Sequence, residues 1–196
     1  MATACSQGEA QSCTPWLQCR DEQQLVGTDA PHTTLFRMLQ SLASLVAWIV
    51  GTSLAAVSGA VAAQSASAFY AQVDRPPWAP PAWAFGPAWT LLYICMAVAA
   101  WRVWRIDGFS GARGELALYA VQLALNALWS WLFFGRRTGL GATIDVICLL
   151  VMIAVTMVAF WKRDPVAGAL FVPYLAWVSF ATALTVAVWR RNPTLL

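Results

Sequence analysis

The sequence is organised around one short stretch, Arg75-Pro76-Pro77-Trp78-Ala79-Pro80-Pro81-Ala82-Trp83-Ala84-Phe85-Gly86-Pro87-Ala88-Trp89. Five prolines and three tryptophans stand here in an otherwise apolar chain. Each proline fixes its own φ at about −65° and disfavours helix in the residue before it, so residues 75–80 are expected to be extended and non-helical. A helix can begin at Pro81, because a proline in the first turn gives up no needed hydrogen-bond donor. The stretch therefore predicts a rigid aromatic loop that leads directly into an apolar helix.

This loop admits two interpretations. It can be a lid with a ligand pocket beneath it. It can also be an interfacial turn whose tryptophans anchor it among lipid headgroups, where indole rings are enriched. The residues of the loop alone leave both interpretations open.

The composition indicates an all-α integral membrane protein. Hydrophobic residues make up 60% of the chain and charged residues 11%. A helix of about 20 apolar residues crosses a hydrocarbon core of roughly 30 Å. Four uncharged segments reach that length, at residues 38–73, 82–101, 116–135 and 165–189, and a fifth, 140–161, contains only Asp145. The sequence therefore predicts one bundle of five transmembrane helices, with the two termini on opposite sides of the membrane.

The expected boundaries are these. Residues 1–34 are polar, lack the apolar core of a secretory signal, and are expected to form a disordered tail. Residues 35–192 form the transmembrane domain, and 193–196 a short C-terminal tail. Met38 is an alternative start. The five helices are expected near residues 42–63, 81–105, 115–134, 140–161 and 166–190.

The polar residues exclude several classes of function. The formal charge of +3 and the scattered basic residues do not indicate nucleic-acid binding. Lys and Arg are divided almost evenly between the two sides, so they do not predict an orientation. Cys5, Cys13 and Cys19 match no zinc-ligand spacing, and His32 is the single histidine. We therefore expect no metal site.

The first expected helix carries Gly51, Ala55 and Gly59 four residues apart, on one smooth face. Such a face lets a second helix approach closely. It can serve packing within the chain or a homodimer contact.

The third expected helix carries polar residues in its middle. Gln122, Asn126 and Trp129 share one face, and amides cannot face lipid tails cheaply. This face is expected to point into the bundle. Its polar groups can form hydrogen bonds between helices, contact a ligand, or do both.

Two features in the last two helices have alternative explanations. Asp145 is a carboxylate inside a span, which makes it a functional candidate, but water or the helix N-terminus could stabilise it near the span's end. Pro173 frees the carbonyl of Ala169 and should bend the last helix. Trp177 with Ala181 on its face then makes room for a flat molecule, or packs as an ordinary aromatic residue beside a hinge.

Taken together, these residues resemble the TspO/MBR family, the tryptophan-rich sensory proteins that include the mitochondrial translocator protein, or peripheral benzodiazepine receptor. The resemblance covers residues 42 to 192, and its motifs fall in order along the first long loop and the second, third and fifth spans. They are the loop 75–83 with Phe85-Gly86-Pro87-Ala88-Trp89-Thr90, Tyr93 and Met96, Gln122-Leu123 with Asn126 and Trp129, Pro173-Tyr174 with Trp177, Phe180-Ala181-Thr182, and Trp189-Arg190.

The resemblance implies a five-helix bundle, often dimeric, with a pocket under the first long loop that binds porphyrins and other flat hydrophobic ligands. By position, the pocket residues are Tyr70, Phe85, Trp89, Gln122, Asn126, Trp129, Trp177 and Ala181, closed by Pro76, Trp78, Pro81 and Trp83. Animal members are credited with a sterol site at the end of the last helix. Here Val186 stands in place of its tyrosine, so tight sterol binding is not expected.

The carboxylates of a porphyrin suggest further partners. Arg75, Arg136 and Arg137, with Arg190 and Arg191, belong to one side of the predicted bundle and would surround the pocket's mouth. We expect some of them to pair with the carboxylates, as guanidinium groups do.

Three functions follow from the resemblance. The chain is expected to be a receptor or sensor that binds tetrapyrroles and regulates their handling or a stress response. The alternatives are light- and oxygen-dependent porphyrin degradation by Trp89 and Trp177, and transport of porphyrin or sterol-like ligands. No resident cofactor is expected. The bacterial inner membrane is favoured, and the mitochondrial outer membrane is expected if the source is eukaryotic.

Overall fold

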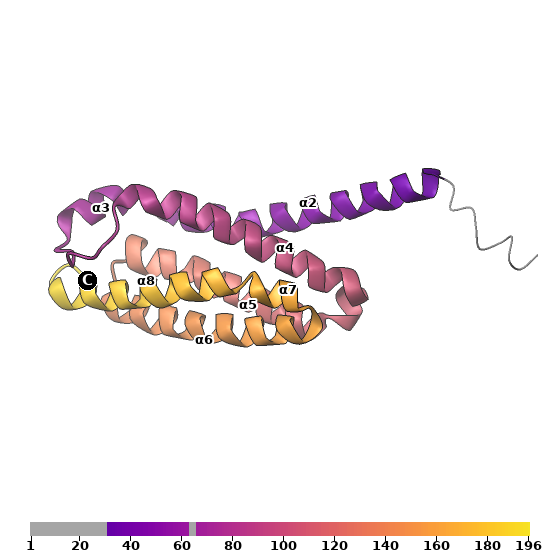
Figure 1. Cartoon of the computed structure of the whole chain (residues 1–196). Coiled ribbons are helices and arrows are strands. Elements are labelled where there is room, and N and C mark those ends of the chain that lie inside the picture. The colour runs from indigo at the N-terminus through magenta and orange to yellow at the C-terminus, as the bar shows by residue number, and fades with distance from the viewer. Residues whose placement is uncertain (1–30, 63–65) are drawn as a thin grey trace, which may run out of the picture. The chain divides into compact units, whose positions relative to one another are not determined.

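A computed structural model describes residues 31–62 and 66–196, and all regular secondary structure in these two ranges is helical (Figure 1). The chain divides into two units, residues 1–41 and 42–196, and the packing described below is that of the second unit. Residues 1–30 of the expected tail, with Cys5, Cys13 and Cys19, lie outside the described residues. The elements are α2 (Pro31–Ala62), α3 (Ala66–Gln72), the 3-10 turn η2 (Ala82–Ala84), α4 (Phe85–Gly111), α5 (Arg113–Ser130), the π-helical turn η3 (Trp131–Gly135), α6 (Gly139–Arg163), α7 (Pro165–Ala169) and α8 (Val172–Arg191).

Five helical segments among the described residues are long and apolar enough to cross a membrane, which confirms the predicted fold class. They are Met38–Ala62, Ala82–Gly111, Arg113–Gly135, Gly139–Arg163 and Pro165–Arg191. The first helix differs from the expectation at its start, because α2 begins at Pro31. A proline is well suited to the first turn of a helix, where its missing N–H has no partner to lose.

The two proline features behave as the sequence predicts. Residues 73–81 are non-helical, with one turn closed by the Ala79 N–H donating to the Pro76 carbonyl at 2.9 Å. Before Pro173, α7 ends at Ala169 and α8 begins at Val172, so the last span is broken one turn ahead of the proline. The short helix α3 was not predicted.

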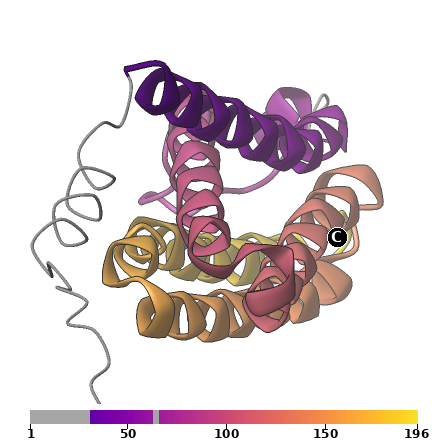
Figure 2. The ribbon, with the colours of Figure 1, turned by 90° about the vertical axis from the view of Figure 1, so that its right-hand side faces the viewer.

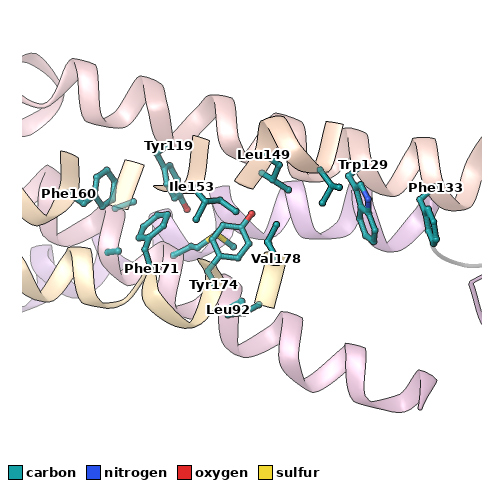
Figure 3. Packing of buried hydrophobic residues seen from close by; sticks show 14 of the residues in the cluster. Leu92, Tyr119, Trp129, Phe133, Leu149, Ile153, Phe160, Phe171, Tyr174 and Val178 are labelled. Carbon is teal, nitrogen blue, oxygen red and sulfur yellow. The ribbon is translucent and has the colours of Figure 1, made fainter. Parts of the chain in front are cut away.

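Helices α5, α6 and α8 form what we call the packed layer (Figure 2). Helix α4 packs on α5 and α7. Aromatic rings from α5, α6 and the α7–α8 junction meet inside the layer, as Figure 3 shows. Phe160 lies 6.1 Å from Tyr119 and 5.1 Å from Phe171 between ring centres, and Phe171 lies 6.1 Å from Tyr174. Phe160, Phe171 and Tyr174 are fully buried, so these contacts form the centre of the core.

Gly168 allows α7 to lie against the end of α6. A Cβ atom at this position would be 2.7 Å from the Cα of Trp161, which is closer than real Cβ atoms approach backbone. Only glycine fits this contact without a backbone shift.

Two arginines tie α4 to the connections at one end of the bundle. The Arg163 guanidinium donates to Asp107 Oδ2 and Glu115 Oε1, both at 2.6 Å, and to the Gly111 carbonyl at 2.8 Å. Arg102 donates to Asp164 Oδ2 at 2.6 Å, and Asp164 also caps α7 by accepting the Val166 N–H at 2.9 Å. The hydrogen bond from Arg102 lowers the pKa of the Asp164 carboxyl below its usual value.

The small-residue face of α2 is used within the chain at one point. A Cβ at Gly59 would lie 3.2 Å from Ser130 Oγ of α5, so this glycine brings α2 close to α5. A Cβ at Gly51 would meet nothing within 4 Å, and Ala55 is half-buried. Close intrachain packing is therefore seen at Gly59, and the homodimer contact stays a prediction.

Candidate ligand-binding site

A cavity of about 700 Å³ lies between α2, α4 and α5. Helix α2 contributes mainly small side chains, among them Ser53, Ala56, Gly59 and Ala60, which leave room for the cavity. Helices α4 and α5 contribute the large rings. No charged residue lines the cavity in the part of the chain that the structure describes. The space therefore suits an apolar molecule.

Five of the residues assigned to the pocket by sequence line this cavity. They are Tyr70, Phe85, Trp89, Asn126 and Trp129, and they come from α3, α4 and α5. Their rings contact one another and the core: Phe85 lies 5.8 Å from Tyr70, and Trp89 lies 5.7 Å from Tyr93 and 6.2 Å from Tyr174. The fold thus brings indole and phenol rings from separate helices to one chamber.

The other assigned residues lie elsewhere. Gln122 and Ala181 are buried in the packed layer. Trp177 of α8 does not line the cavity. It packs edge-on against Phe85, with ring centres 5.9 Å apart. In the loop, Pro76 is buried, Pro81 and Trp83 are exposed, and Trp78 contacts Phe180 at 5.7 Å. Of Trp89 and Trp177, the two residues suggested for photochemistry, only Trp89 lines the cavity.

The two amides of α5 belong to a buried chain of hydrogen bonds. Tyr93 OH donates to Asn126 Oδ1 at 2.7 Å, and Asn126 Nδ2 donates to Tyr174 OH at 2.8 Å. Tyr174 OH in turn donates to Gln122 Oε1 at 3.1 Å, and Gln122 Nε2 lies 3.8 Å from Met96 Sδ. The chain links α4, α5 and α8, so the interhelical hydrogen bonds expected of these amides are present.

Tyr93 and Tyr174 are the functional residues that the polar-face argument missed. Their positions carried a usable signal, because a tyrosine inside an apolar span needs a partner for its hydroxyl. Tyr93 also lines the cavity. The cavity wall and the core of the packed layer are therefore joined through Asn126.

The cavity offers few hydrogen-bond donors. Ser53 and Thr90 donate to carbonyls of their own helices at 2.8 and 2.9 Å, and Tyr70 OH donates to the Pro80 carbonyl at 3.2 Å. Trp129 Nε1 is buried and has no hydrogen-bond partner among the described residues. The site thus fits a flat, largely apolar ligand.

One arginine stands beside the cavity wall. The Arg75 guanidinium carbon lies 4.8 Å from the ring centre of Tyr70. Burial raises the pKa of the Tyr70 phenol, and the Arg75 charge partly offsets this rise. Arg137 lies over Phe69 at 5.3 Å, and none of Arg75, Arg136 and Arg137 lines the cavity, but Tyr70, the ring that Arg75 contacts, does. Arg75 is thus the best placed of the three for a carboxylate partner.

Asp145 does not line the cavity. It is buried in α6, and its Oδ2 atom has no hydrogen-bond partner within the described ranges. No group of three or more His, Cys, Asp or Glu side chains in those ranges could hold a metal ion.

Five spans define a multi-pass membrane protein, and an uncharged cavity walled by aromatic residues lies among its helices. The family model for the TspO/MBR family matches residues 42–190, and the chain belongs to that family. It is 38% identical to the protein CrtK of Rhodobacter capsulatus over 160 residues, which cover 78% of this chain and 95% of the relative.

Two further relatives extend the comparison. The tryptophan-rich sensory protein of Cereibacter sphaeroides is 40% identical over 149 residues, 74% of this chain and 92% of the relative. The translocator protein of Homo sapiens is 41% identical over 126 residues, 63% of this chain and 75% of the relative. The similarity thus includes bacterial and mammalian members, and it confirms the family that the motifs indicated.

Proposed function

We propose that this protein is a membrane receptor or sensor that binds porphyrins and other flat hydrophobic molecules in the cavity between α2, α4 and α5, and regulates tetrapyrrole handling or a stress response. The observation that carries the proposal is the uncharged cavity of about 700 Å³ walled by Trp89, Trp129, Tyr70 and Phe85. Pockets for small ligands commonly measure about 300–1,000 Å³ and are mostly apolar, so the space is adequate. The names of two relatives, a tryptophan-rich sensory protein and a translocator protein, agree with it.

A porphyrin suits the chemistry of this wall. Its flat π-system can stack on indole and phenol rings, and each such pair contributes roughly 0.5–1.5 kcal/mol beyond the area buried. Arg75, beside Tyr70, can pair with a carboxylate on the edge of the ring.

Filling the cavity tests the proposal. Gly86 lines the cavity, and a Cβ there would meet nothing within 4 Å, so Gly86→Leu would place an isobutyl group in the ligand's space. The matched control is Gly51→Leu, since Gly51 has the same free surroundings but does not line the cavity. Protoporphyrin is titrated into the purified full chain, and quenching of tryptophan fluorescence gives the affinity.

We expect saturable quenching with the wild-type protein and the Gly51→Leu variant, and a loss of affinity of about tenfold or more with Gly86→Leu, equivalent to roughly 1.4 kcal/mol. Equal affinities for all three proteins would show that porphyrin binds outside this cavity. The absence of saturable quenching in the wild type would remove porphyrins as the ligand class.

A second variant tests the carboxylate contact. Arg75→Gln removes the charge beside Tyr70, and Arg113→Gln removes an exposed arginine at the start of α5, away from the cavity. If Arg75 pairs with a porphyrin carboxylate, only Arg75→Gln weakens binding and reduces its dependence on salt. An unchanged salt dependence would contradict this role for Arg75.

A further inference from the structure

A second hollow lies on the surface of the bundle, between α6 and α8. It has a volume of about 640 Å³ and shares no lining residue with the cavity described above. Leu150 lines it from α6. On α8 its lining is formed mostly by small side chains, Ser179, Thr182, Ala183 and Ala187, together with Val186, and it ends at Arg190 and Arg191. Ser179, Ala183 and Ala187 are spaced four residues apart, about one helical turn, so their small side chains lie in a row and form a groove along α8.

The walls of this groove are apolar in effect. Ser179 Oγ donates to the Leu175 carbonyl at 2.8 Å, and Thr182 Oγ1 donates to the Val178 carbonyl at 2.7 Å. Both hydroxyl hydrogens are therefore used within α8. A hydrocarbon chain can lie against such walls without leaving a donor unsatisfied.

The groove has the length of one leaflet. Ser179 and Arg190 are eleven residues apart, which is about 17 Å along an α-helix. The hydrocarbon core of a bilayer is roughly 30 Å thick, so the groove reaches from the end of the span to about the membrane centre. Arg190 and Arg191 are the last residues of that span, and long basic side chains at a helix end reach toward the headgroups. An acyl chain in the groove would thus place its headgroup beside two guanidinium groups.

This end of the bundle is strongly positive. The loop at 73–81 and the C-terminus come together here, since the Asp74 N–H donates to Asn192 Oδ1 at 2.8 Å and Asn192 Nδ2 donates to the Asp74 carbonyl at 3.0 Å. The connection at 136–138 leads into Gly139, where a Cβ would clash with Trp189 of α8. These three segments hold Arg75, Arg136 and Arg137 near the end of α8, and Asp74 is their one acidic side chain.

Neither arginine of the groove is neutralised firmly. Asp74 lies 3.4 Å from Arg191 Nη1, with both side chains well exposed. Arg190 forms no ion pair within the residues that the structure describes. An anionic group is therefore the complement that the end of the groove lacks.

We propose that this groove binds an anionic membrane phospholipid, with one acyl chain along the small residues of α8 and the phosphate at Arg190 and Arg191. Guanidinium groups form paired, charge-assisted hydrogen bonds with phosphate oxygens, and basic sites at helix ends recognise anionic headgroups. A sterol would fill the apolar groove, but its single hydroxyl would leave both positive charges without an anion.

The test is native mass spectrometry of the full chain in detergent, titrated with dioleoyl phosphatidylglycerol or dioleoyl phosphatidylcholine. We expect tighter retention of phosphatidylglycerol. The double variant Arg190→Gln/Arg191→Gln should lower the affinity for phosphatidylglycerol roughly 30-fold, because two surface arginines are lost, and should leave the affinity for phosphatidylcholine unchanged. Ala183→Leu fills the groove and should weaken the binding of both lipids.

Matched controls keep charge and volume effects separate from the site. Arg113→Gln removes an exposed arginine at the other end of the bundle, and Ala124→Leu adds the same volume to an exposed position on α5 outside the groove. Neither should change lipid retention. Equal retention of the two lipids, equal losses with Arg113→Gln and the double variant, or a preference for cholesterol over phosphatidylglycerol would each overturn the proposal. Gly86 lines the cavity and not the groove. A porphyrin titration therefore tests the first site separately from the lipid titration.

Discussion

The packed layer of this protein is buried to a greater extent than the α2–α4 side. In the most apolar windows of the α6 span and of the α7–α8 span, 39% of the residues are buried, against 17% for α2 and 22% for α4. Two pairs of glycines show the same difference. A Cβ would clash at Gly139 of α6 and at Gly168, which lies against the end of α6, but would meet nothing within 4 Å at Gly51 of α2 and Gly86 of α4. The layer maintains its own packing and internal hydrogen bonds. The α2–α4 side can therefore keep a cavity open without loss of the fold.

The largest expected effect breaks the contact between α7 and the end of α6, where glycine meets backbone. Gly168→Ala puts a Cβ 2.7 Å from Trp161 Cα, and backbone cannot yield as a side chain can. We expect a destabilisation of about 3 kcal/mol, the upper part of the range for overpacking. Thermal unfolding of the purified full chain, followed by tryptophan fluorescence, measures it.

The matched control for this change is Gly51→Ala on α2. Alanine meets no neighbour there and favours helix over glycine by up to about 1 kcal/mol, so its melting temperature should be equal to the wild type's or higher. Equal melting temperatures for Gly168→Ala and the wild type would show that α7 can move away from α6 at little cost.

A smaller effect is expected from the hydrogen bonds that join the layer to α4. Tyr174→Phe leaves Asn126 Nδ2 and Gln122 Oε1 buried without their shared partner. The expected destabilisation is about 1–2 kcal/mol, since hydrogen bonds between transmembrane helices contribute modestly. The measurement is again thermal unfolding.

Tyr70→Phe is the control for the loss of a hydroxyl. Its bond to the Pro80 carbonyl is longer, at 3.2 Å, and joins α3 to the loop outside the layer. We expect a change smaller than that of Tyr174→Phe. A larger loss for Tyr70→Phe would mean that the loop, and not the buried chain of hydrogen bonds, limits stability.

The sequence predicted the layer better than the cavity. Five spans follow from hydropathy and length, and the break before Pro173 follows from the chemistry of proline. The inward position of Gln122 and Asn126 follows from the cost of placing amides in lipid. These predictions need no knowledge of which helices are neighbours.

The cavity's location depends on that knowledge. Lipid tails and a protein core are equally apolar, so hydrophobic periodicity does not say which face of α2 meets the bundle. Ser53, Ala56 and Ala60 carried no signal that they would line the cavity, and nothing in the sequence separated Trp177 from Trp89. The contacts of Arg163 with Asp107 and Glu115, 56 and 48 residues away, likewise arise only from the fold.

The smallest expected effect concerns the ion pair that joins α4 to the α6–α7 connection. The hydrogen bond from Arg102 lowers the pKa of Asp164 below its usual value of 3.8, so the charged form is favoured in the folded protein. The resulting stability is present in full above pH 3.8 and is lost as the pH falls through the lower, folded-state pKa. Asp164→Asn keeps a good N-cap for α7 but removes the charge. At pH 7 this variant should be less stable by a few tenths to about 1 kcal/mol, since the arginine is partly exposed.

This difference from the wild type should shrink as the solution is acidified and disappear once Asp164 is protonated. Arg102→Gln removes the other partner and should show the same dependence on pH, and the double variant should add little to either. Melting temperatures at pH 7 and at about pH 3 test this. A stability difference that stayed constant between these pH values would assign the role of Asp164 to its cap on α7, and α4 would then be held at this end of the bundle by packing and by Arg163.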